Sequence, residues 1–164
     1  MKHDRFLVGI LIFIGLLVVL ALALFFIRQD NQVFVADNTP ENIVRNYALA
    51  VQKQDYQRAY SYLQDSNTKP TYDTFRRAFL TNQLNTSSNA LQVGSAQYIG
   101  SGEATVALTI LYASYGPFSQ GSSSTDSATL VQQGGVWKIS YMPYPYFSYD
   151  WFQPPQPTLM PLKP

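Results

Sequence analysis

The longest hydrophobic stretch of the chain runs from Phe6 to Ile27 and contains no charged residue, Asn or Gln. A helix of this length rises about 33 Å at about 1.5 Å per residue, which is enough to cross a hydrocarbon core of about 30 Å. A cleaved secretory signal has a shorter apolar region, and the A-x-A sequence at Ala21 to Ala23 lies inside the stretch instead of after it. The pattern therefore predicts an uncleaved transmembrane helix over residues 6–27, with the lipid bilayer as its partner.

The basic residues around this stretch predict its orientation. Lys2 and Arg5 precede it, whereas Arg28 alone follows closely, which under the positive-inside rule favours a cytoplasmic N-terminus. The predicted localisation is a single-pass protein of the cell membrane with its C-terminal domain outside the cytoplasm. The predicted organisation is a cytoplasmic stub (1–5), the transmembrane helix (6–27), a juxtamembrane linker (28–38), a folded domain (39–142) and a tail rich in Pro and aromatic residues (143–164).

Three stretches after residue 38 carry apolar residues at helical spacing. Thr39-Pro40-Glu41 is typical of a helix start, with Thr as the N-cap and Pro at the first helical position. Asp55 can cap a second, shorter helix, and a third helix is predicted from Thr71 to about Leu84. Their predicted inward residues recur three and four positions apart, and they are Ile43, Val44, Tyr47, Ala48, Val51, Tyr56, Ala59, Tyr60, Leu63, Phe75, Ala78 and Phe79.

After Ala90 the period of the apolar residues changes to two, which predicts strands over 91–99, 103–115, 127–133 and 136–141. Gly134-Gly135 is typical of a two-residue hairpin turn. The apolar face of the sheet is predicted to carry Val106, Leu108, Ile110, Trp137 and Ile139. The predicted fold class is α+β, in which three helices pack on one face of a curved four-stranded antiparallel sheet.

These motifs together resemble a known superfamily. Thr39-Pro40-Glu41, then Gln54-Asp55-Tyr56 with Ala59-Tyr60, and finally Gly134-Gly135-Val136-Trp137-Lys138-Ile139 are similar to the nuclear transport factor 2-like (cystatin-like) domains, closest to membrane-anchored bacterial members. The resemblance spans Thr39 to Tyr141 and implies a cone-shaped α+β domain. It implies no particular function, because enzymes and binding modules both occur on this fold.

Composition excludes several kinds of chemistry. The chain has no Cys and His3 is its only histidine, so we expect no metal site, no cofactor and no Cys- or His-based catalysis. The net charge of +1 without a basic cluster predicts no nucleic-acid binding. The carboxylates are expected at helix ends, turns and loops, with Asp126 in a loop and none at an inward strand position, which predicts no catalytic residue.

Aromatic residues are the remaining candidates for a site. A buried Tyr usually keeps a hydrogen-bond partner, so hydroxyls could line the inside of the cone. The possible pocket-lining residues are Tyr47, Tyr60, Tyr98, Tyr112, Trp137 and Tyr141. The same residues also fit a plain core, and Trp137 in particular is predicted to be buried near Tyr47 or Phe79. The tail could cover the mouth of the cone, lie on a membrane interface, or be a polyproline ligand of a partner.

The sequence thus predicts a non-enzymatic domain at the cell envelope that binds a protein partner or a small ligand. One alternative is an isomerase- or dehydratase-type enzyme that uses a Tyr/Asp pair in the cone. Another is a structural homodimer formed through the outward sheet face, where residues are small or apolar, namely Thr105, Ala107, Thr109 and Leu111.

Overall fold

The computed structural model describes residues 5–27, 33–113 and 121–153, and the chain divides into two compact units, Met1–Val33 and Phe34–Pro164. The first unit contains helix α1 (Arg5–Ile27), whose described side chains run from Val8 to Leu24. Among the residues that the structure describes, no helix has the length and apolar character needed to cross a membrane. This finding contradicts the predicted transmembrane helix at 6–27 and the predicted single-pass localisation.

The second unit begins with the three helices that the sequence predicts. They are α2 (Pro40–Gln52), α3 (Tyr56–Ser61) and α4 (Tyr72–Leu80). Thr39 and Asp55 are the N-caps of α2 and α3, as predicted, and Thr71 is the N-cap of α4. Each side chain accepts a hydrogen bond from the backbone N–H three residues on. Helix α4 ends before the predicted Leu84, because the chain turns at a left-handed Asn82 and the Leu84 N–H then donates to the Ala78 carbonyl, at 2.9 Å.

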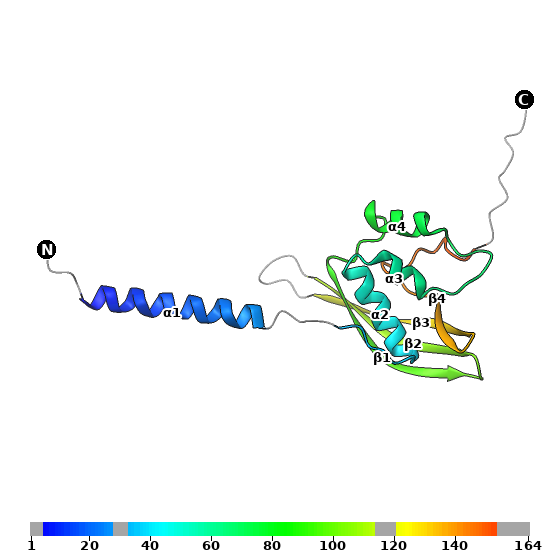
Figure 1. Ribbon diagram of the computed structural model, residues 1–164, viewed down its shortest axis with the longest axis horizontal. Helices are drawn as coiled ribbons and strands as arrows, with labels where there is room; N and C mark the ends of the chain where they lie inside the picture. The colour runs from blue at the N-terminus through cyan, green and yellow to red at the C-terminus, as the bar shows by residue number, and fades with distance from the viewer. Residues whose placement is uncertain (1–4, 28–32, 114–120, 154–164) are drawn as a thin grey trace, which may run out of the picture. The chain divides into compact units, whose positions relative to one another are not determined.

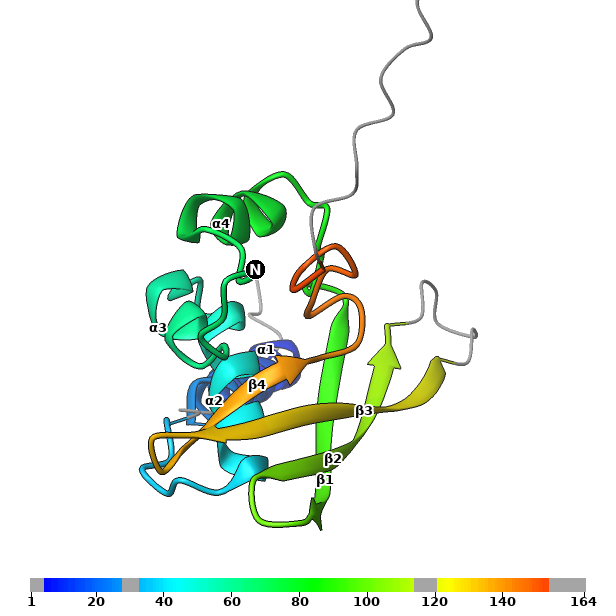
Figure 2. The ribbon, with the colours of Figure 1, turned by 90° about the vertical axis from the view of Figure 1, so that its right-hand side faces the viewer.

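A four-stranded antiparallel sheet follows, in the order β1-β2-β3-β4. Its strands are β1 (Asn89–Ile99), β2 (Glu103–Tyr112), β3 (Ser122–Gln133) and β4 (Val136–Tyr141). Helix α2 lies across one face and contacts β1, β2 and β4, while α3 packs on α2 and α4 on α3 (Figures 1 and 2). The predicted α+β class is confirmed in this respect. The predicted inward residues of β2 and β4 are all buried.

Two strands differ from their predicted limits. Strand β2 ends at Tyr112, and the residues predicted to continue it include 114–115, which lie outside the described part of the chain. Strand β3 begins at Ser122, five residues before the predicted start, because this polar stretch pairs with β2 through its backbone, as in Leu111 with Ser123. A run of Ser and Thr shows no alternation of apolar and polar residues, so the hydrophobic pattern of the sequence does not reveal this pairing.

Strand β1 contains a β-bulge that changes which residues face the core. The register shifts between Val93 and Ala96, so that Ala96 lies opposite the buried Val106. At a bulge a backbone N–H loses its partner on the neighbouring strand. Here the Ala96 N–H donates to the Glu41 carboxylate instead, at 2.8 Å. Ile99, at the end of β1, is 54% exposed.

Segments before and after the predicted domain also pack on it. The buried Asn46 side chain donates to the Val35 carbonyl (2.7 Å) and accepts from the Val35 N–H (2.9 Å), which fixes the described part of the predicted linker. At the other end, the described part of the predicted tail carries buried aromatic residues, and the Trp151 ring lies 5.1 Å from that of Phe75. This burial agrees with the alternative in which the tail covers apolar surface of the domain.

Candidate binding groove

Two of the tyrosines predicted to line a pocket are held by the domain's own backbone. The hydroxyl of the fully buried Tyr47 donates to the Tyr146 carbonyl at 2.6 Å, and that of Tyr60 donates to the Pro70 carbonyl at 2.8 Å. Burial raises the pKa of Tyr47 far above its usual value of about 10. Tyr47 is therefore a protonated core residue whose hydroxyl is already used.

Of the other four candidates, Tyr98 and Trp137 contact each other, while Tyr112 and Tyr141 lie on β2 and β4. The rings of Tyr98 and Trp137 are 5.9 Å apart, although they belong to the two edge strands β1 and β4, so they close one end of the curved sheet. Trp137 is buried, as predicted, but this ring contact is with Tyr98 and not with the predicted Tyr47 or Phe79. Tyr141 packs on Phe147, with ring centroids 5.9 Å apart, and the half-buried Tyr112 ends β2. The structure does not bring the six residues into one site.

Asp126 is not in a loop, as the sequence predicts, but on β3. It pairs with Leu108, and since paired residues share a face of the sheet and Leu108 is buried, Asp126 holds an inward position. The pKa of Tyr141 is raised mainly by its burial and to a smaller extent by the negative charge of Asp126. Asp126 is exposed to water, whereas the Tyr/Asp alternative places its inward carboxylate in a deep pocket.

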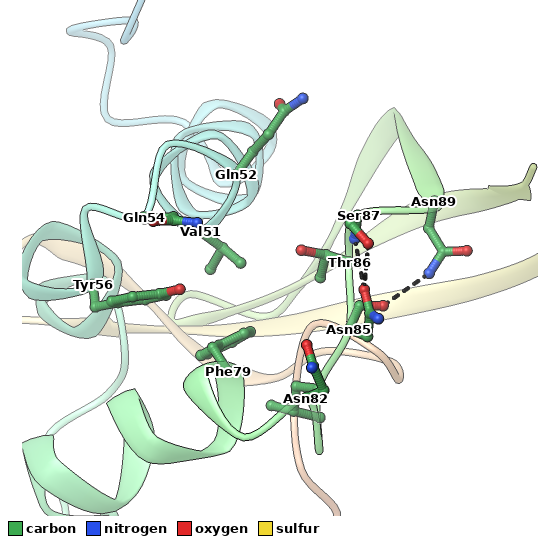
Figure 3. A pocket seen from close by; sticks show the side chains of 11 residues that line it. Val51, Gln52, Gln54, Tyr56, Phe79, Asn82, Asn85, Thr86, Ser87 and Asn89 are labelled. Atoms are coloured by element: carbon green, nitrogen blue, oxygen red, sulfur yellow. Dashed lines mark hydrogen bonds between the residues drawn. The ribbon is translucent and has the colours of Figure 1, made fainter.

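A groove of about 220 Å³ lies where α2 and α4 end and β1 begins (Figure 3). Its floor consists of buried apolar side chains, Val51, Phe79 and Leu84, and the Tyr56 ring stacks on Phe79 at 5.6 Å with an interplanar angle of 19°. The remaining lining residues are all neutral amides or alcohols, namely Gln52, Gln54, Asn82, Asn85, Thr86, Ser87 and Asn89. The lining contains no charged residue.

The two helix ends at this groove share an unusual backbone feature. Gln54 and Asn82 follow the caps of α2 and α4 with φ angles of 58° and 59°, in the left-handed region that glycine normally occupies at this position. At the end of α2, the Asp55 N–H closes the turn by donating to the Ala50 carbonyl at 2.8 Å. The turns are thus well formed, and each places a carboxamide side chain on the groove.

The opposite wall is a loop fixed by its own side chains. The Asn85 side-chain oxygen accepts hydrogen bonds from the N–H (3.0 Å) and hydroxyl (2.6 Å) of Ser87, and the Asn89 amide donates to the Asn85 carbonyl at 3.1 Å. Figure 3 shows that the Thr86 side chain between them points into the groove, facing the Tyr56 hydroxyl across it. The wall therefore presents a hydroxyl from a rigid loop.

This lining is better suited to binding a ligand than to catalysing a reaction. It holds carboxamides and hydroxyls, which donate and accept hydrogen bonds, but no general base, activated nucleophile or acidic pair. In the described ranges, no group of three or more His, Cys, Asp or Glu residues could hold a metal ion. The sequence contains a partial signal for this site: residues 82–89 are polar and turn-like, but Val51, Tyr56 and Phe79 look like ordinary core residues.

Comparison with known proteins gives matches only among solved structures. No family model and no curated protein matches the chain. One similar structure is a SEC-C motif containing protein from Rhodopseudomonas palustris (16% identity, 63% of this chain and 77% of that one, TM-score 0.46). A second is an NTF-2 like protein of unknown function from Shewanella oneidensis MR-1 (9% identity, 60% and 88%, TM-score 0.44). A third is an uncharacterized cystatin fold protein from Novosphingobium aromaticivorans (13% identity, 60% and 93%, TM-score 0.38).

The solved structures similar to this chain include proteins described as NTF-2 like and as cystatin fold. Nothing among them supports the membrane-anchored part of that resemblance.

Proposed function

We propose that the unit from Phe34 onward is a non-enzymatic binding domain, and that the groove between the ends of α2 and α4 and the start of β1 is its binding site. The observation that carries this proposal is the composition of the groove: a buried aromatic and aliphatic floor surrounded by neutral amides and hydroxyls. Binding sites characteristically combine an apolar surface with a few placed polar groups. The ligand is a small molecule or a short segment of a partner protein.

The rigidity of the groove supports this role. Its floor residue Phe79 is packed against Phe75, with ring centroids 5.2 Å apart, and against Tyr56. Its polar groups come from two closed helix ends and from the Asn85–Ser87 turn. A ligand would therefore find its partners already in place and would not have to order them, which lowers the entropic cost of binding.

Thermal shift measurements on the full chain would test the proposal. A panel of small neutral compounds and uncharged peptides is screened, because a ligand that binds only the folded state raises its melting temperature. We expect at least one compound to raise the melting temperature of the parent, and to lose this effect in Thr86→Val, which removes one hydroxyl at nearly constant volume. Ser61→Ala, an exposed hydroxyl outside the lining, is the matched control. Compounds that act equally on parent and Thr86→Val bind elsewhere, and a panel with no active compound would contradict the proposal.

A further inference from the structure

We propose, building on the binding role above, that the groove takes one ring of a neutral sugar, a pyranose with free hydroxyls. Such a ring has a face of C–H groups and an edge of hydroxyls that both donate and accept hydrogen bonds. The groove has the complementary arrangement, an apolar floor within a rim of neutral hydrogen-bonding groups (Figure 3).

The size of the groove limits the ligand to about one ring. Its volume of about 220 Å³ lies below the roughly 300–1,000 Å³ of sites that enclose drug-sized ligands. The rim residues Gln52 and Asn85 are exposed, so further units of a longer sugar would extend into solvent. The flat apolar contact would come from the half-buried Tyr56 ring, which the buried Phe79 supports by stacking on it at 5.6 Å.

The rim supplies partners for sugar hydroxyls. The Tyr56 and Thr86 hydroxyls point into the groove from opposite sides, and the Asn82 amide points toward it from below in Figure 3. Hydroxyls and carboxamides each carry both donors and acceptors, so every sugar hydroxyl can find a group of either kind. A hydrocarbon would leave these polar groups without partners, which costs binding free energy.

Electrostatics favour a neutral sugar over an acidic one. Helices α2 and α4 both end at the groove, and the C-terminal end of a helix carries a partial negative charge. The lining has no Lys or Arg that could pair with a carboxylate or phosphate, and no Asp or Glu that could pair with an amine. Lys53, at the end of α2, lies over the Phe34 ring at 5.4 Å and is not part of the lining.

The backbone at Asn82 allows a variant that tests the site. Asn82 occupies the left-handed position after the cap of α4, where glycine is the residue most often found. Replacing Asn82 with glycine should preserve the turn while removing the amide from the groove. This gives a variant whose effect on binding can be separated from an effect on folding.

Saturation-transfer NMR on the full chain would test the proposal, with methyl β-glucoside, methyl β-galactoside and N-acetylglucosamine as neutral probes. Glucuronate is the matched acidic probe, and the tripeptide Gly-Asn-Gly the matched peptide probe. For a single ring we expect a dissociation constant on the order of 1 mM for at least one neutral sugar, with the strongest transfer to the C–H protons of one ring face. Glucuronate should bind at least about 10-fold more weakly.

Variants locate the binding. Asn82→Gly should weaken the neutral sugar by about 3–10-fold, the loss of one neutral hydrogen bond, without lowering the melting temperature. Thr86→Val should weaken sugar binding to the same extent. Gln57→Ala, which removes an exposed amide outside the lining, should leave sugar binding unchanged. Equal binding of glucuronate, or sugar binding that neither groove variant weakens, would overturn the proposal.

The remaining outcomes separate this inference from the binding role itself. If Gly-Asn-Gly binds and Asn82→Gly weakens it while no sugar binds, the groove is a binding site but the sugar class is wrong. If no probe binds and no compound of the thermal-shift panel acts on the parent, both the sugar and the binding role are contradicted.

Discussion

Trp151→Ala should destabilise the domain more than any other change in its C-terminal segment. Trp151 is 6% exposed, and its ring lies 4.9 Å from Phe147, 5.1 Å from Phe75 and 6.3 Å from Phe79. Phe75 and Phe79 lie on α4, so this one side chain joins the last described residues of the chain to the helices. Its removal would leave a cavity bordered by three phenylalanine rings.

The expected cost follows from the area that this ring buries. An aromatic side chain buries about 150–250 Å², which at about 25 cal/mol per Å² corresponds to about 4–6 kcal/mol. Measured Trp→Ala substitutions in cores cost about 3–5 kcal/mol, the range we adopt. A domain is stable by only about 5–15 kcal/mol, so the substitution removes a large part of the total.

Urea unfolding of the full chain, followed by far-UV circular dichroism, would measure the effect. With a slope of about 2 kcal/mol per M, the unfolding midpoint should fall by about 1.5–2.5 M. Tyr149→Ala, which removes a 62% exposed aromatic ring two residues away, is the control and should shift the midpoint by less than about 0.3 M. If Trp151→Ala unfolds like the parent, the C-terminal segment is a covering that the core does not need, and the reasoning fails.

Three further substitutions test other parts of the fold. Stability should fall as pH rises above about 10, by up to about 1.4 kcal/mol per pH unit for each group, because burial raises the pKa of Tyr47 and raises that of Tyr146 to about 12. Below pH 10 both phenols are protonated in either state, so Tyr47→Phe should reduce the alkaline slope in urea titrations, and an unchanged slope would refute the assignment. Asn46→Ala should cost about 1–3 kcal/mol and accelerate hydrogen exchange at Val35, its backbone partner; unaltered exchange there would contradict the role of the amide. Gly94→Ala should lower the melting temperature, because its Cβ would lie 3.1 Å from a carbonyl oxygen of β2, and an unchanged melting temperature would show that the bulge can open.

The sequence determined the local elements of the folded unit. The caps Thr39, Asp55 and Thr71 begin the helices where predicted, and the Gly134-Gly135 turn joins β3 to β4 as predicted. These features depend on residues within a few positions of one another, so a local pattern contains all the information they need. The alternation of apolar residues likewise predicted the buried faces of β2 and β4.

Tertiary structure decided what depends on distant residues. Whether Ser122 to Asp126 is a loop or a strand is settled by the backbone of β2, and the face presented by Ala96 is settled by a bulge whose free N–H meets Glu41. The predicted crossing at residues 6–27 rested on an unbroken apolar run, but no described helix meets the requirements of a membrane span. The groove joins two helix ends to the start of a strand, and no sequence period relates such positions. Its floor residues look like core and its rim residues look like loop until folding brings them together.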